Sequence, residues 1–157
     1  HNIHLTLKFL GDVSPANVDI LAQVLRSEAD SCPPFDFSIS GLGSFPNSKR
    51  ARVLFIGIQA PAELEALQRG IESATARLGY ESESRAFSPH LTIGRVRDNV
   101  TSSDQQQIRK TLEETKIDSL GTARVDSIHL YKSELKPGGS VYTKIFSAPL
   151  QIPRGEN

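Results

Sequence analysis

The chain has 157 residues, enough for one domain whose hydrophobic core needs no disulfide or metal to hold it together. Its 18 basic side chains balance 18 acidic ones, which argues against a protein that coats long nucleic acid with a broad basic face. The single cysteine, Cys32, excludes an intramolecular disulfide, and neither a leader nor an apolar run of membrane-spanning length is visible. We therefore expect a cytoplasmic protein without a membrane partner, and we expect a monomer.

Residues 2–10 alternate in polarity, which predicts a strand with one aliphatic and one polar face. The aliphatic face consists of Ile3, Leu5, Leu7 and Phe9, and the polar face of His4, Thr6 and Lys8. His4 and Thr6 are therefore expected to point in the same direction.

Helical signals recur three times further along the chain. Ser14 as N-cap and Pro15 at the first helical position predict a helix over residues 14–29. An apolar stripe that ends at Gly79 predicts a second helix over 61–79, and Ser103 and Gln106 in capping-box spacing predict a third over 102–115. Strands are predicted over residues 34–45, 51–59, 90–96, 122–135 and 140–150.

The order of these elements is strand, helix, two strands, helix, strand, helix and two strands. This order is typical of an α+β protein with hairpin-connected antiparallel sheets. No linker, low-complexity tract or second autonomous domain is visible, so we expect residues 1–157 to form a single domain.

A short phrase, His-Leu-Thr followed by an aliphatic residue, occurs at residues 4–7 and again at residues 90–93. In each copy the histidine and the threonine share the polar face of a predicted strand. Two imidazoles that face one site can act as general acid and general base, because a histidine pKa near 6.5 makes both forms available at neutral pH. Each threonine hydroxyl is a suitable donor to a phosphate oxygen lying between them. Packing alone does not explain the repeat, because packing requires only the aliphatic residues of each segment. The repeat therefore suggests two related lobes.

Three other interpretations of these segments stay open. A single H-x-T is most often an ordinary strand sequence, since short motifs match by chance. A zinc site needs a third or fourth ligand that neither a cysteine nor an H-x-x-x-H spacing supplies, so we predict no metal. A serine or threonine nucleophile lacks a G-x-S-x-G elbow and a third orienting group.

The segments "HLTLKFLG" and "SPHLTIGRVR" resemble the paired H-x-T-x motifs of the 2H phosphoesterase superfamily, and more closely the RNA 2′,3′-cyclic phosphodiesterases once named 2′-5′ RNA ligases. "GLGSFPNSKRARVLFIGIQ" and "SELKPGGSVYTKIFSAPL" are similar to the family's central and closing hairpins, so the resemblance covers nearly the whole chain. It implies a bilobal α+β fold with two pseudo-symmetric lobes, antiparallel sheets and flanking helices, in which each lobe contributes one motif to a central cleft. Family members usually carry a strand and a helix before the first motif, and this chain, which begins three residues before it, is expected to lack both.

The resemblance implies a role for each matched residue. His4 would donate a proton to the departing ribose oxygen, and His90 would accept a proton from the attacking water. Thr6 and Thr92 would bind the non-bridging phosphate oxygens. Arg95 matches a family arginine that contacts the substrate phosphate.

Arg95 presents a geometric difficulty within the predicted strand. Strict alternation from His90 places Arg95 on the opposite, apolar face, which Leu91 and Ile93 occupy. We therefore expect either a local bend at Gly94 or a strand that ends before Arg95.

Other candidate residues carry weaker signals. Lys49, Arg50 and Arg52 form a basic run that can steer an RNA backbone, although such a run in a hairpin loop is more often only solvated. Three aromatic side chains are candidates for stacking on a base, but we expect core packing for each of them: Phe9, Tyr131 and Tyr142. His129 has no threonine two residues on, and we expect it to be structural or peripheral.

We therefore predict an RNA 2′,3′-cyclic phosphodiesterase, a hydrolase that uses two histidines and neither a metal nor another cofactor. Its partners would be RNA or tRNA ends that carry a cyclic phosphate, or small nucleotides. In the family the 3′ oxygen leaves and a 2′-phosphomonoester remains, and the same site can run in reverse to join tRNA halves through a 2′-5′ bond. The motifs do not separate this activity from hydrolysis of 2′-5′ oligonucleotides or small cyclic nucleotides. A nucleotide-binding module without turnover is the alternative from another class.

Overall fold

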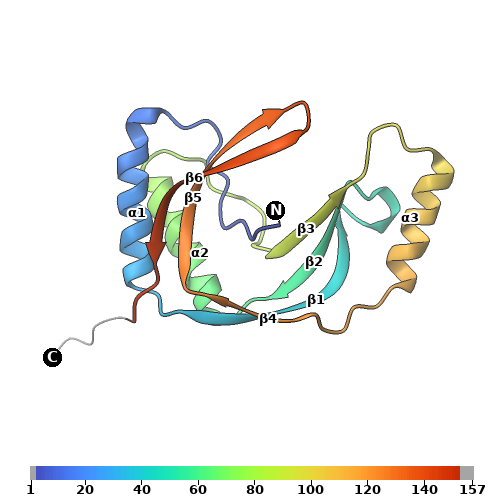
Figure 1. Ribbon diagram of the computed structural model, residues 1–157, viewed down its shortest axis with the longest axis horizontal. Helices are drawn as coiled ribbons and strands as arrows, with labels where there is room; N and C mark the ends of the chain where they lie inside the picture. The colour runs from blue at the N-terminus through green and yellow to red at the C-terminus, as the bar shows by residue number, and fades with distance from the viewer. Residues whose placement is uncertain (1–2, 153–157) are drawn as a thin grey trace. The chain divides into compact units, whose positions relative to one another are not determined.

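The computed structural model describes residues 3–152 and has an α+β architecture (Figure 1). Three α-helices, two 3₁₀ turns and six strands follow one another in the described part of the chain. In chain order they are η1 (Pro15–Asn17), α1 (Val18–Asp30), β1 (Phe35–Phe45), η2 (Ser48–Arg50), β2 (Val53–Gln59), α2 (Ala62–Arg77), β3 (His90–Arg95), α3 (Ser102–Glu114), β4 (Gly121–Val125), β5 (Ser127–Lys136) and β6 (Gly139–Pro149). The three predicted helices are confirmed.

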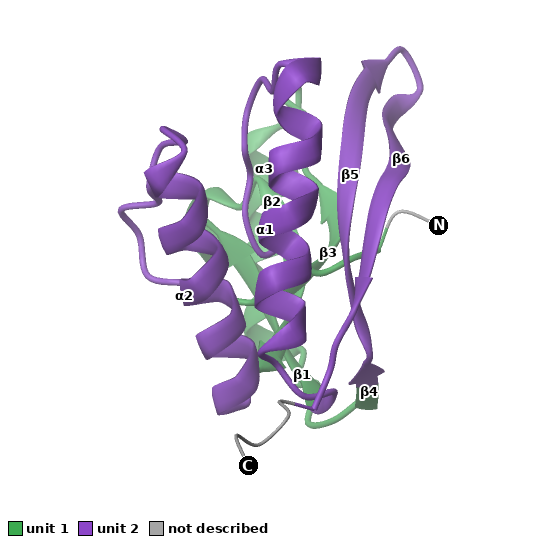
Figure 2. Cartoon of the chain, turned by 90° about the vertical axis from the view of Figure 1, so that its left-hand side faces the viewer, with its two compact units in different colours: residues 1–6, 37–60, 88–123 green, residues 7–36, 61–87, 124–157 purple. Residues whose placement is uncertain are grey.

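The chain divides into two compact units (Figure 2). Unit 1 comprises residues 1–6, 37–60 and 88–123, and unit 2 comprises residues 7–36, 61–87 and 124–157. Both H-x-T segments belong to unit 1, which differs from the expectation that each lobe contributes one motif.

The strands β3, β2, β1 and β4 form a sheet in that order, and β2 pairs antiparallel with both β1 and β3. Alternation along β2 directs Ile56 and Ile58 to one face, where both are buried. A bulge between Ile39 and Leu42 bends β1, and Gly41 there has a φ of 80° that favours glycine. The bulge allows the Gly41 N–H to donate to the Ile117 carbonyl at 2.8 Å.

Unit 2 is built around α1, which contacts α2 and the β5–β6 hairpin (Figure 2). Ser14 caps the 3₁₀ turn that precedes α1, and Pro15 occupies its first position, as predicted. Gly79, with a φ of 91°, ends α2, and the Tyr80 N–H donates back to the Thr75 carbonyl. The buried side chains of the two helices are Leu21, Leu25, Ala29, Leu64, Leu67, Ile71 and Thr75.

The strand predicted over residues 2–10 is wrong in the part that the structure describes. Leu5 forms one isolated antiparallel bridge with Leu91, and the chain bends at Leu7. Ile3 and Phe9, which the alternation assigned to an aliphatic face, are 63% and 80% exposed. Alternating polarity sets the direction of side chains, but a strand also needs a backbone ladder, and among residues 3–10 the structure records a single β-bridge, at Leu5.

Two predicted boundaries also differ from the structure. The N-cap of α3 is Thr101, whose hydroxyl accepts from the Asp104 N–H at 3.1 Å while the Asp104 carboxylate accepts from the Thr101 N–H at 3.0 Å. The predicted box at Ser103 and Gln106 is therefore wrong, because a box with an ionised acceptor begins two residues earlier. The strand predicted over 122–135 is two strands, since β4 joins the four-stranded sheet and β5 pairs with β6.

Within residues 3–152, no helix is both long and apolar enough to cross a membrane.

Candidate active site

The second H-x-T segment lies on β3, at the edge of the four-stranded sheet. His90 pairs with Gly57, and Thr92 pairs with Phe55. Opposite partners in an antiparallel pair share a face, so His90 and Thr92 lie on the face of Phe55, away from the buried Ile56. Both side chains are half-buried, so they remain accessible from solvent.

A bulge in β3 determines where Arg95 points. The register with β2 shifts by one residue after Thr92, so Gly94 pairs with Leu54 and Arg95 with Val53. Because Val53 alternates with Phe55 on β2, Arg95 returns to the face of His90 and Thr92. The expected bend is therefore present. Ile93 is the extra residue and is 50% exposed, so its predicted place on the apolar face is wrong.

The first H-x-T segment lies beside the second. The antiparallel bridge between Leu5 and Leu91 joins them, and both segments belong to unit 1. In an antiparallel pair the residue before Leu5 lies opposite the residue after Leu91, which sets His4 opposite Thr92 and Thr6 opposite His90. The flanking residues point away from the face of the paired leucines. Continued on either side of the bridge, this register would bring both histidines and both threonines to one face.

In a continued register His4 and His90 would be diagonal neighbours, which antiparallel geometry separates by about 7–8 Å. His4 is exposed and Thr6 is half-buried.

A hydrogen bond sets the tautomer of His90. The Nδ1 atom lies 2.7 Å from the backbone carbonyl oxygen of Ser88. A carbonyl oxygen only accepts, so in the neutral ring Nδ1 carries the proton and Nε2 presents a lone pair. Sequence reasoning missed Ser88, although its position two residues before His90, ahead of Pro89, is a signal for a local contact.

Two aromatic rings pack against His90. The Phe45 and Phe55 rings stack on each other at 4.5 Å between centroids. The His90 ring centroid lies 4.9 Å from that of Phe45 and 5.1 Å from that of Phe55. No sequence signal points to these two residues, because they lie on β1 and β2, far from His90 along the chain.

The weaker candidates have mixed outcomes. Lys49, Arg50 and Arg52 are exposed, as expected for a solvated loop, and Arg52 forms an ion pair with Asp98 at 2.8 Å. The expectation of core packing is wrong for Phe9, which is 80% exposed, and it is also wrong for Tyr131, which is 45% exposed. These two rings extend beyond the local core because Phe9 follows the bend at Leu7 and Tyr131 lies on an outer face of the β5–β6 hairpin.

His129 lies in unit 2 and contacts Tyr131 edge to face, with 6.0 Å between ring centroids. Burial lowers the pKa of His129, and the positive charge of Lys144 lowers it further. Its Nδ1 atom is buried without a hydrogen-bond partner. These surroundings favour the neutral form of the ring and agree with a structural residue.

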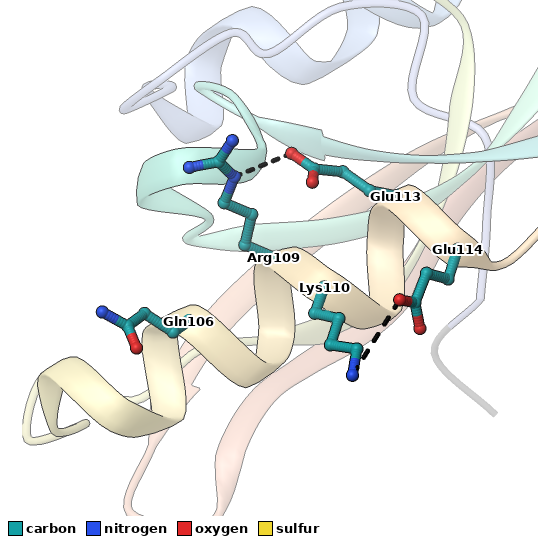
Figure 3. Close-up of a pocket in the computed structure, with 5 residues that line it drawn as sticks. All are labelled: Gln106, Arg109, Lys110, Glu113 and Glu114. Carbon is teal, nitrogen blue, oxygen red and sulfur yellow. Dashed lines mark hydrogen bonds and ion pairs between the residues drawn. The ribbon is translucent and has the colours of Figure 1, made fainter.

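A surface hollow along α3 lies apart from the predicted site residues (Figure 3). Arg109 and Glu113 form an ion pair at 2.7 Å, and Lys110 and Glu114 form another at 4.0 Å. The charges of this helix face therefore neutralise one another, as in many exposed helices. The hollow offers neither an imidazole nor an unpaired charge to a substrate.

Among residues 3–152, no group of three or more His, Cys, Asp or Glu side chains lies close enough together to hold an ion.

An α+β fold that pairs two H-x-T segments antiparallel to each other defines a 2H phosphoesterase. A sequence model of the "2'-5' RNA ligase superfamily" matches residues 1–137. The chain belongs to this superfamily.

Curated relatives and solved structures agree with this assignment. The chain is 34% identical over 142 residues to an RNA 2′,3′-cyclic phosphodiesterase of Methanothermobacter thermautotrophicus, covering 90% of this chain and 75% of the relative. It is 33% identical over 146 residues to an enzyme of the same name from Aquifex aeolicus, covering 92% and 76%. E. coli LigT, solved with 3′-AMP, is similar with a TM-score of 0.74 and 28% identity, over 95% of this chain and 77% of that one. A protein of Thermus thermophilus gives a TM-score of 0.80 with 26% identity, over 96% and 79%.

Proposed function

We propose that this protein hydrolyses RNA 2′,3′-cyclic phosphate ends to 2′-phosphomonoesters, using two histidines and no metal. The observation that carries the proposal is the Leu5–Leu91 bridge, which sets the two H-x-T segments side by side in opposite directions. The names of the curated relatives support the same activity. The substrates would be RNA or tRNA ends that carry a cyclic phosphate.

His90 is the general base in this proposal. The bond from Nδ1 to the Ser88 carbonyl directs the unprotonated Nε2 away from the backbone, which is the form a base needs. His90 takes a proton from the attacking water as the new P–O bond forms. The half-buried setting of the ring leaves Nε2 accessible to that water.

His4 is the general acid. It protonates the 3′ oxygen as the bond from phosphorus to that oxygen breaks, so a 2′-phosphate and a free 3′ hydroxyl remain. Each positioned proton transfer accelerates a reaction by on the order of 10²- to 10⁴-fold. The two protons balance, because one leaves the water and one enters the leaving group.

Thr6, Thr92 and Arg95 bind the phosphate. The two hydroxyls donate to the non-bridging oxygens, and the Arg95 guanidinium neutralises the charge that develops on them. The β3 bulge supports this role for Arg95, because without it the side chain would point to the opposite face. With a 5′ hydroxyl in place of water as the attacking group, the same side chains would join a cyclic phosphate end to a second RNA through a 2′-5′ bond: His90 takes the proton of that hydroxyl, and His4 protonates the departing 3′ oxygen.

The test is incubation of the purified protein with a short RNA that ends in a 2′,3′-cyclic phosphate, with EDTA present. We expect a 2′-phosphate product that chromatography separates from the 3′-phosphate isomer. His4→Ala and His90→Ala should each lower the rate by about 10²-fold or more. His129→Ala is the matched control, since it removes a histidine outside the proposed site, and it should keep its activity.

Three results would contradict the proposal. Near-normal rates in folded His4→Ala or His90→Ala protein would remove the acid and base assignment. Binding of the RNA without turnover by folded wild-type protein would favour a nucleotide-binding module, and turnover of 2′-5′ oligonucleotides alone would favour the other phosphodiesterase.

A further inference from the structure

We infer that Phe45 and Phe55 are positioning residues, which hold the His90 imidazole in the orientation from which Nε2 accepts a proton. The inference rests on the proposed function for its catalytic consequence. Its structural basis is the contact of three rings from three adjacent strands, β1, β2 and β3.

The two phenyl rings pack against one side of the imidazole, because the three ring centroids, 4.5, 4.9 and 5.1 Å apart, form a nearly equilateral triangle. The plane of the Phe45 ring is inclined by 69° to that of His90, and the plane of the Phe55 ring by 53°. The phenyl rings are themselves stacked with an interplanar angle of 28°. Movement of the imidazole toward this side would therefore bring it against the stacked pair.

Two glycines make room for this arrangement. His90 pairs with Gly57 and Phe55 pairs with Gly43, so each ring lies opposite a residue without a side chain. A Cβ at Gly43 would lie 2.6 Å from the Cε2 atom of Phe55, which is closer than packing allows. The Phe55 ring thus covers the Gly43 backbone, and Phe45 flanks it from the next position on the same face of β1.

The rings are not part of the buried core. Phe45 and Phe55 are half-buried, whereas Ile56 and Ile58, on the opposite face of β2, are buried. Because these two aromatic side chains lie on the more exposed face of the sheet, they contribute less to core packing than Ile56 and Ile58. Their contact with His90 gives them a specific role.

The hydrogen bond to Ser88 alone does not fix the ring. With the ring tethered at Cβ and one contact at Nδ1, coupled changes of the two side-chain torsions can still displace Nε2. Proton transfer is sensitive to such movement, since a misplacement of about 1 Å can cost about 10²-fold in rate. The phenyl pair limits this movement on the side where it packs, so the pair acts on catalysis through His90 and need not touch the substrate.

The test is Phe55→Leu, with Phe45→Leu as the second variant, because leucine keeps apolar volume and removes the ring. For the hydrolysis of cyclic phosphate RNA we expect kcat to fall by about tenfold or more, with KM within about twofold of the wild-type value. Gly43→Ala should also lower kcat by displacing the Phe55 ring. Gly138→Ala is its matched control, because a Cβ at Gly138 meets no atom within 4 Å.

Nitrogen NMR of the imidazole provides a readout that general destabilisation would not move. Wild-type His90 should carry its proton on Nδ1 when neutral, and the Leu variants should show a mixture of tautomers. Unchanged kcat in a folded Leu variant, or a lower kcat with an unchanged tautomer, would overturn the positioning role. If wild-type protein proves inactive on the RNA, the proposed function fails and the tautomer comparison still decides the inference. If no variant folds, a wild-type ring protonated on Nε2 would overturn the inference, and one protonated on Nδ1 with restricted ring motion would support it.

Discussion

Replacement of Lys8 by methionine should destabilise the protein by about 3 kcal/mol. The Lys8 ammonium donates to the Glu72 carboxylate at 2.7 Å and to the Glu81 carbonyl at 2.6 Å. Glu72 also accepts from the Glu83 N–H at 2.9 Å, so one carboxylate joins helix α2 to two other segments of unit 2. Methionine keeps an unbranched apolar stem like that of the lysine and removes its charge.

The magnitude follows from the burial of the pair. The Lys8 side chain is 5% exposed and that of Glu72 is 20% exposed. Removal of one partner from a buried pair costs about 3–5 kcal/mol, because the other charge stays desolvated. The partial exposure of Glu72 places the cost at the lower end. For a chain of this size, about 3 kcal/mol corresponds to a fall in melting temperature of about 6–12 °C.

Thermal unfolding followed by circular dichroism measures the effect. Arg69→Met is the matched control, since its pair with Glu65 is 3.9 Å long and both side chains are more than half exposed, and it should cost less than about 1 kcal/mol. Lys8→Met combined with Glu72→Met should recover part of the loss, because no unpaired charge remains. Equal melting temperatures for Lys8→Met and Arg69→Met would refute the reasoning.

Three further outcomes are expected. Thr101→Ala should lower stability by about 1 kcal/mol in thermal unfolding, whereas Ser103→Ala should change it less, and equal losses would contradict the assigned cap. Burial raises the pKa of the Cys32 thiol, and the nearby Glu63 charge raises it further, so iodoacetamide should label Cys32 slowly in native protein and faster in urea; fast native labelling would contradict this. The lowered pKa of His129 means that the native state binds fewer protons than the unfolded state below the usual histidine pKa, near 6.5. Stability is therefore lost as pH falls through that value, and His129→Gln should lose less of it between about pH 7.5 and pH 5.5 in urea titrations; an equal loss would refute the assignment.

The helices could be predicted because their signals are local. Ser14, Pro15 and the glycine after α2 act within one turn of the helix ends they mark. The cap of α3 shows the limit of such signals. The sequence offers two pairs with capping-box spacing, Ser103–Gln106 and Thr101–Asp104. The spacing alone does not show which pair begins the helix, and in the structure it is Thr101–Asp104.

The first segment could not be predicted as it is, because its partners lie far along the chain. The alternation of residues 2–10 predicts that His4 and Thr6 lie on one side of Leu5. It cannot show that the β-bridge of this segment forms at Leu5. Nor can it show that Lys8 forms an ion pair with Glu72 instead of facing solvent. The rings around His90 were missed for the same reason, since Phe45 and Phe55 reach it only through the pairing of β1, β2 and β3.

The β3 bulge shows how one extra residue decides what a motif can do. Periodicity from His90 puts Thr92 on the same face and Arg95 on the opposite one, so a phosphate site made of all three contradicts regular strand geometry. The structure removes the contradiction by leaving Ile93 out of the ladder, which costs one unpaired position and exposes half of an isoleucine side chain. An exposed Ile93 is unfavourable for stability alone, and the gain is that Arg95 returns to the face of His90 and Thr92. The proposed phosphate site requires a cation at this position. Packing of the sheet does not require one.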